Sequence, residues 1–170
     1  MKSEHLNQIV RALTREMTKT IEQRLQDMGI AIPDSPLPSA NYVPYTKSGN
    51  LVFISGQISI DNGNLISGKL GQDLDIEEGQ LAAKVCALNI ISHLQKACNG
   101  SLDRLEQVVK LGGFVNSTSD FADAPLVING ASDLFVEIFG NKGKHARFAV
   151  CAHCLPRNAA VEVDGIFEIR

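Results

Sequence analysis

Arg147 begins an apolar stretch, residues 147–154, whose pattern predicts a β-strand. In a strand, Arg147, Ala149, Cys151 and His153 share one face, because successive side chains alternate. A guanidinium at the edge of a sheet presents a planar fork of donors that fits a carboxylate or a phosphate. The pattern fits an ordinary solvated or salt-bridged arginine as well, so anion binding is one of two interpretations.

The last predicted strand, residues 160–169, carries two acidic side chains. Glu162 and Asp164 lie on one face and Val161 and Val163 on the other. Carboxylates on an otherwise apolar strand either face solvent or line a cleft. The alternation alone favours solvent.

Gly56 interrupts the apolar run of residues 51–60, within the tripeptide Ser55-Gly56-Gln57. A glycine inside a strand marks a bulge or a close approach of another group to the backbone, so Gly56 could offer its N–H and C=O to a ligand. Ser55 is no nucleophile elbow, since that motif requires Gly-x-Ser-x-Gly at a strand–helix turn. Neither a phosphate-binding loop nor a dinucleotide fingerprint is present in the sequence.

The cysteines suggest a metal site only weakly. Cys151 and Cys154 are spaced like half of a zinc site, but a strand would place them on opposite faces, and no second pair follows. Cys86, Cys98 and His93 fall on a predicted helix, where small core residues are the simpler interpretation. A Cys151–His153 nucleophilic pair would lack a group to orient the base. We therefore expect no metal and no cofactor.

The elements that must position these residues follow from hydrophobic spacing and turn signals. Helices are predicted over residues 3–28, 77–98 and from Pro125 to Gly140, and strands over 51–60, 108–115, 147–154 and 160–169. Asp61-Asn62-Gly63 predicts a turn into a short return strand through Leu65 and Ile66. Asn129-Gly130 is weak helix sequence, so the last helix could also begin later than Pro125.

This order predicts an α+β protein with a mixed sheet, because hairpins are expected both before the first packed helix and at the last two strands. The two long helices would pack on one face of the sheet as a two-layer sandwich. Residues 1–37 are expected to form an N-terminal helix and an extended connector, and residues 38–170 the domain that holds the candidate site.

Composition limits the function. The 170 residues include 44% hydrophobic ones, enough for one domain with its own core, and no apolar run approaches the ~18–20 residues of a membrane span. A net charge of -3 and only 5% aromatic residues argue against nucleic-acid binding. The N-terminus lacks a signal-peptide pattern, so a cytoplasmic location is expected. Fourteen glycines and few aromatics suggest that burial is completed by oligomerisation.

Two motifs at compatible spacing resemble one family. Residues 42–57 read Tyr-Val-Pro-Tyr-Thr-Lys-Ser-Gly-Asn-Leu-Val-Phe-Ile-Ser-Gly-Gln, and residues 146–164 contain Ala-Arg-Phe-Ala-Val, Leu-Pro and Val-Glu-Val-Asp. They are similar to the signatures of the RidA/YjgF family, also called endoribonuclease L-PSP or reactive intermediate deaminases. The resemblance covers about residues 38–169, and the N-terminal helix looks more like the family's longer branch.

The resemblance implies a chorismate-mutase-like fold and a homotrimer with three ligand clefts between subunits. RidA-type members hydrolyse enamine or imine acids such as 2-aminoacrylate to a 2-keto acid and ammonia. By position, Arg147 would hold the substrate carboxylate, Tyr42 would line the cleft and Glu162 would handle the attacking water. Gly56 with Ser55 would supply backbone contacts, and Asn129 would match a cleft asparagine.

The sequence departs from the family pattern at two places beside Arg147. Ala149 replaces the usual cysteine, and Phe148 is bulkier than the small residue usually found there. Both are expected to reshape the cleft.

Three functions follow from these observations. The first is a metal-free hydrolase of small enamine or imine acids. The second is a trimer that binds small carboxylates without turnover and signals to a partner. A ribonuclease is the weakest, because the chain is acidic and shows no paired histidines or metal constellation.

Overall fold

The computed structural model describes residues 19–34 and 40–170. Within these ranges the elements are, in chain order, α2 (Ile21–Asp27), β1 (Tyr45–Ser48), β2 (Leu51–Ile58), β3 (Ile60–Asp61), β4 (Asn64–Leu65), α3 (Ile76–Ala97), η1 (Leu102–Arg104), β5 (Leu105–Asn116), α4 (Ala124–Phe139), η2 (Gly140–Gly143), β6 (Ala146–Ala152), η3 (Pro156–Asn158) and β7 (Val161–Ile169). The predicted helix over residues 3–18 and part of the predicted connector, residues 35–39, lie outside the described residues.

The main sheet has the strand order β1-β2-β7-β5-β6. Neighbouring strands are antiparallel except β5 and β6, which are parallel. In the sequence, α4 connects these two strands. The predicted α+β class with a mixed sheet is confirmed. The predicted hairpin of the last two strands is wrong, because β7 lies between β2 and β5 and not beside β6. In that position β7 finds hydrogen-bonding partners along both of its edges.

The first predicted hairpin forms only in part. The turn at Asn62 and Gly63 is confirmed, with both residues at positive φ, but β3 and β4 make a separate two-stranded ladder. Within the main sheet, the preceding partner of β2 is β1, a strand that the sequence pattern did not predict. Three of the four β1 residues are exposed, so this edge strand carries no apolar alternation to reveal it.

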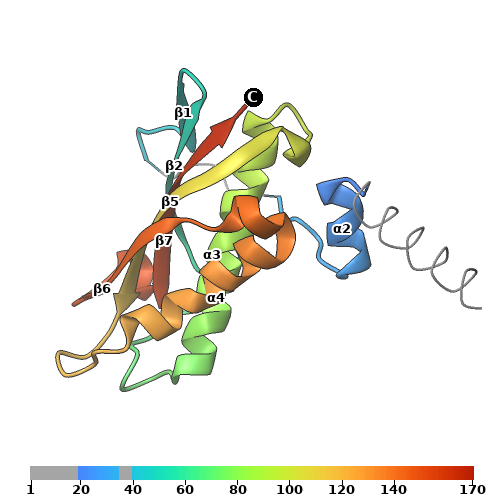
Figure 1. The fold of residues 1–170 in the computed structure, drawn as a ribbon. Coiled ribbons are helices and arrows are strands. Elements are labelled where there is room, and N and C mark those ends of the chain that lie inside the picture. Colours follow the sequence, from blue (N-terminus) through green and yellow to red (C-terminus); the bar gives the residue numbers. More distant parts are fainter. Residues whose placement is uncertain (1–18, 35–39) are drawn as a thin grey trace, which may run out of the picture.

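The two long helices cover one face of the sheet, and the described part of the chain places no helix on the other (Figure 1). We call this second side the open face. The burial of β7 alternates accordingly: Val161, Val163 and Phe167 are fully buried, and Glu162 and Asp164 belong to the open face. Among the described helices, none has the length and hydropathy needed to cross a membrane.

Gly130 explains the weak helix sequence in α4. The helix begins at Ala124 and continues through Asn129 and Gly130, so the alternative of a later start is wrong. A Cβ atom at Gly130 would lie 2.1 Å from the carbonyl oxygen of Gln80 in α3. Glycine lowers the helix propensity at this position, but its lack of a side chain is what allows α3 to pack closely against α4.

The predicted N-terminal helix of residues 3–28 is not continuous. Thr20 has extended backbone angles and caps α2, with its side chain accepting from the Gln23 N–H while the Gln23 side chain accepts from the Thr20 N–H. This reciprocal cap starts α2, because a threonine hydroxyl competes well for the unpaired N–H groups of a first turn. Leu25 is buried, so α2 packs on the domain, as expected for a surface helix.

The buried His93 in α3 should make the protein sensitive to acid. The side chain is 2% exposed, neither ring nitrogen has a hydrogen-bond partner among the described residues, and burial, with a smaller effect of Lys96, lowers the pKa of His93 to about 4. His93 in the folded state therefore takes up a proton at lower pH than His93 in the unfolded chain. As a result, the free energy of unfolding decreases as the pH falls from about 6.5 towards 4. Over this pH range we expect the unfolding free energy of His93→Leu to decrease by up to about 2–3 kcal/mol less than that of the wild type.

Urea unfolding at pH 7.5, 6 and 4.5, at one protein concentration, measures this slope. His153→Gln serves as the control, because His153 is exposed. An identical slope in wild type and His93→Leu would contradict the prediction.

Gly130→Ala should destabilise the protein, although alanine is the better helix former. The added methyl would overlap the Gln80 carbonyl and push α3 and α4 apart, at a cost of about 1–3 kcal/mol. Asp133→Ala, an exposed position of the same helix, should change the unfolding free energy by less than about 0.5 kcal/mol. Equal or greater stability of Gly130→Ala in chemical denaturation would refute the close-packing explanation.

Candidate functional site

Arg147 lies on the edge strand β6, on the face that the helices cover. It sits beside Leu111 in the parallel ladder, and Leu111 is buried under the helices. The guanidinium donates from Nη1 to the Ser132 hydroxyl at 2.9 Å and from Nη2 to the Pro125 carbonyl at 3.0 Å. Within the described residues Arg147 forms no ion pair, so its positive charge remains available to an anion.

Asn129 lies on the stretch of α4 that holds this guanidinium. Pro125, Asn129 and Ser132 are spaced by four and three residues along α4, which puts them on one stripe of the helix. The outer two hold Arg147, so Asn129 lies between its anchors. The structure thus brings together two of the predicted site residues, Arg147 and Asn129.

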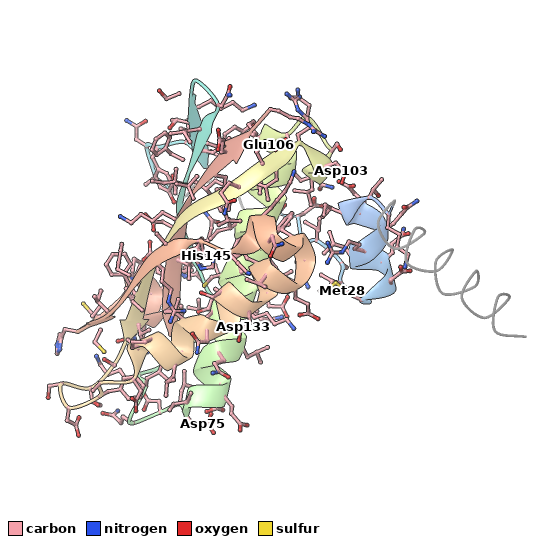
Figure 2. All side chains as sticks on the ribbon, viewed as in Figure 1. Met28, Asp75, Asp103, Glu106, Asp133 and His145 are labelled. Carbon is pink, nitrogen blue, oxygen red and sulfur yellow. The ribbon has the colours of Figure 1, made fainter. Side chains whose placement is uncertain are left out.

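His145 extends the group around Arg147. Its Nε2 lies 3.0 Å from the Ser132 hydroxyl, and its Nδ1 lies 2.6 Å from the Gly143 carbonyl oxygen. Because a carbonyl only accepts, Nδ1 carries the proton and Nε2 accepts from Ser132. Burial lowers the pKa of His145 in spite of the hydrogen bond to Gly143, which acts to raise it, and the nearby positive charge of Arg147 lowers it further. Figure 2 shows His145 where β6 begins, next to α4.

Sequence reasoning missed both Ser132 and His145, although two signals pointed to them. His145 precedes Arg147 by two residues, so an extended chain turns both side chains to the same side. Ser132 follows Asn129 by three residues, on the same stripe of the helix.

Glu162 lies on the opposite face of the sheet, against Gly56. The register of β2 on β7 shifts between Ile54 and Gln57, so the strand is irregular at Gly56, where a bulge or a close approach to the backbone was predicted. A Cβ atom at Gly56 would lie 2.1 Å from Glu162 Oε1, so a larger residue at this position would displace the carboxylate from where it lies. Burial raises the pKa of Glu162, and the neighbouring negative charge of Asp164 raises it further.

Ser55 and Tyr42 lie near the same bulge. The Ser55 hydroxyl donates to the Val43 carbonyl at 2.8 Å, and its N–H donates to the Pro44 carbonyl at 3.0 Å. These bonds fasten the segment that carries Tyr42, whose side chain is 50% exposed. Ser55 therefore positions the backbone that leads to Tyr42, while its own hydroxyl is already engaged.

The predicted site residues thus form two separate groups. Arg147 and Asn129 lie on the helix-covered side, and Glu162, Gly56 and Ser55 lie on the open face or at its bulge. A single chain does not bring Arg147 and Glu162 into one cleft, because the sheet separates them.

The two departures from the family pattern also divide between the faces. Ala149 pairs with the buried Gly113 on the side of Arg147, whereas Phe148 is beside Gly112 on the open face. There its ring packs edge-to-face on Phe114, with centroids 5.3 Å apart. The bulk of Phe148 therefore adds to the side of Glu162 and does not crowd Arg147 of its own chain.

The described residues contain no group of three or more His, Cys, Asp or Glu side chains placed to hold a metal ion. Cys86 and Cys98 are buried thiols, and Cys151 and Cys154 are exposed ones. The Cys151 thiol contacts the Phe121 carbonyl at 3.3 Å. The groups that this arrangement offers for chemistry are the Arg147 guanidinium, the neighbouring carboxylates of Glu162 and Asp164, and backbone groups.

Comparison with known proteins identifies the family. Residues 22–168 match the family model described as "YjgF/chorismate_mutase-like, putative endoribonuclease". Protein TCP17 of Trypanosoma cruzi is 46% identical over 88% of this chain and 94% of its own length. The crystal structure of Agrobacterium tumefaciens Atu1372, a protein of unknown function, has a TM-score of 0.84 at 43% identity and covers 94% of this chain and 99% of its own.

More distant relatives carry names that state an activity. The 3-aminoacrylate deaminase RutC of Acinetobacter baylyi is 27% identical, over 82% of this chain and 97% of its own. The 2-iminobutanoate/2-iminopropanoate deaminase of Dermatophagoides farinae is 26% identical, over 82% of this chain and 94% of its own. Since the family model and these relatives span most of the sequence, the chain belongs to the YjgF/RidA family.

Proposed function

We propose that the protein hydrolyses small enamine or imine carboxylic acids to a 2-keto acid and ammonia, with Arg147 holding the carboxylate. The observation that carries this proposal is the guanidinium itself. It is held at a sheet edge by a hydroxyl and a carbonyl, and no carboxylate of the described residues neutralises it. Two distant relatives named as deaminases of aminoacrylate and iminobutanoate support the substrate class.

The cleft forms between two subunits in this proposal. Arg147 and Glu162 lie on opposite faces of one sheet, so a substrate can meet both only if a neighbouring chain supplies one of them. The open face also carries apolar side chains suited to contact with another copy: Phe53 and Val150 are exposed, and Phe114, Phe148 and Ile166 are half-buried. A homotrimer, as the family resemblance implies, closes such contacts by rotational symmetry.

In the proposed reaction, Arg147 binds the substrate carboxylate through paired N–H donors and presents the imine carbon to water. Glu162 takes a proton from the attacking water as the oxygen adds to that carbon. It returns that proton to the nitrogen, which gives a carbinolamine. The proton of the new hydroxyl then passes by way of Glu162 to the amino group as the C–N bond breaks, so ammonia leaves and the hydroxyl oxygen becomes the keto oxygen. An enamine substrate first tautomerises to the imine by moving a proton from nitrogen to its terminal carbon. The raised pKa of the Glu162 carboxyl is closer to neutral pH. A general acid–base group transfers protons most effectively when its pKa lies near the working pH.

The other predicted residues shape the cleft. Tyr42 and the backbone at Gly56 contact the substrate from the side of Glu162, and Asn129 contacts it from the side of Arg147. Ser55 acts by holding the segment before β1 in place.

Arg147→Ala should lower kcat/KM for freshly generated 2-aminoacrylate roughly 100-fold, because the carboxylate loses its charged partner. Arg147→Lys should recover only a small part, since an ammonium lacks the planar fork. Keto acid and ammonia release above the uncatalysed rate measure the effect. Lys84→Ala, an exposed change on α3, is the control.

Equal activity in wild type and Arg147→Ala would exclude the proposed role of Arg147. Arg147-dependent binding of a 2-keto acid without any turnover would favour the alternative of a metabolite-binding protein.

Mixed assemblies test the shared cleft. Arg147→Ala and Glu162→Gln should each be nearly inactive alone, yet co-expressed trimers that contain both variants should give roughly a third of wild-type activity. This fraction follows because each cleft draws Arg147 from one chain and Glu162 from its neighbour, so a mixed trimer has both residues intact in one of its three clefts. Activity per trimer, after purification with two different tags, is the measurement. No recovery in the mixed trimers would place both residues in a cleft of one chain.

A further inference from the structure

We infer that Ser132 and His145 are positioning residues that orient Arg147 for carboxylate binding. The inference rests on the proposed function and adds the groups that determine the specificity of Arg147 for a carboxylate. Neither residue needs to touch the substrate, since both act through the guanidinium.

The hydrogen atoms in this chain of groups have one consistent arrangement. Arg147 can only donate, so the Ser132 oxygen accepts from its Nη1. The Nδ1–H of His145 is committed to the Gly143 carbonyl, which leaves Nε2 with its lone pair. The single hydroxyl proton of Ser132 therefore goes to His145. With that proton directed away, the Ser132 lone pairs face Arg147.

The end of this relay is anchored in the core. The His145 ring packs edge-on to Phe135, with centroids 6.3 Å apart, and Phe135 is fully buried. Gly143, which receives the Nδ1–H bond, is itself held close, because a Cβ atom there would lie 2.2 Å from the Phe135 carbonyl oxygen. The imidazole ring therefore has little freedom to rotate, and its Nε2 fixes the direction of the Ser132 hydroxyl group.

Two anchors on one helix stripe determine the plane of the guanidinium. Ser132 holds Nη1, and the Pro125 carbonyl holds Nη2. Either bond alone would let the group rotate about the remaining contact. Both together fix the plane of the group, and a fork fixed before the ligand arrives loses less entropy on binding.

His145 must be neutral for this arrangement, since a protonated Nε2 would no longer accept from Ser132. Burial in the contact with Phe135 and the positive charge of Arg147 both disfavour protonation, and the lowered pKa of His145 agrees with this. The relay is therefore intact at neutral pH.

The test compares two ligands of equal shape in the full-length protein. 2-Oxobutanoate carries the carboxylate that Arg147 recognises, and its neutral amide, 2-oxobutanamide, does not. Ser132→Ala and His145→Phe should each weaken calorimetric binding of the carboxylate roughly fivefold and leave amide binding unchanged. In turnover assays KM should rise by a similar factor while kcat is retained, because the reacting carbon and Glu162 are untouched.

Conservative variants separate positioning from folding. Ser132→Thr keeps the hydroxyl and His145→Gln keeps an acceptor near the place of Nε2, so both should bind the carboxylate within about twofold of wild type. Ser101→Ala is the matched control, because the side chain of Ser101 caps no helix turn.

The outcomes distinguish the two proposals. Arg147-dependent carboxylate binding that is unchanged in Ser132→Ala and His145→Phe overturns the relay alone. Equal loss of amide and carboxylate binding also overturns it, since that result indicates a general structural defect. Carboxylate binding that does not depend on Arg147, or no carboxylate binding by wild type, overturns the proposed function and the relay with it.

Discussion

The constraint on which the site depends is that the two long helices of the described residues, α3 and α4, both pack on the same face of the sheet. Side chains alternate along every strand, so each residue either joins the core under α3 and α4 or belongs to the open face. Arg147 falls on the first side and Glu162 on the second. Since backbone and core separate them, chemistry that needs both groups requires a second copy of the chain, and the apolar side chains of the open face provide a surface for that contact.

At two positions in this fold a glycine, which has no side chain, lets another group come close to the backbone and so helps to position functional groups. Gly56 leaves space for the Glu162 carboxylate, and Gly130 lets the backbone of α4 approach Gln80 in α3. The second contact determines where α4 lies over the sheet, and α4 supplies the two groups that hold Arg147. Packing between the helices and orientation of the guanidinium are therefore parts of one arrangement.

Local patterns predicted the helix α3, the turn at Asn62 and Gly63, the bulge at Gly56 and the mixed sheet. They failed where the answer depended on distant partners. The turn at Pro156-Arg157-Asn158 indicated a hairpin, but β7 pairs with β2 and β5, strands distant in the sequence, and so forms backbone hydrogen bonds along both of its edges. β1 was missed because its side chains are largely exposed. The start of α2 after Thr20 was missed because the apolar spacing continues through the helix cap.

The sequence by itself determined which residues could carry chemistry and which family signatures they belong to. Spacing within one strand is enough to show that Arg147 shares a side with Ala149, or Glu162 with Asp164. Only the tertiary structure decided that Arg147 lies under α4, with Ser132 and His145 behind it, and that Glu162 rests on Gly56 across the sheet. The reason is physical. Alternation along a strand determines which residues share a face, whereas the packing of the helices determines which of the two faces is covered.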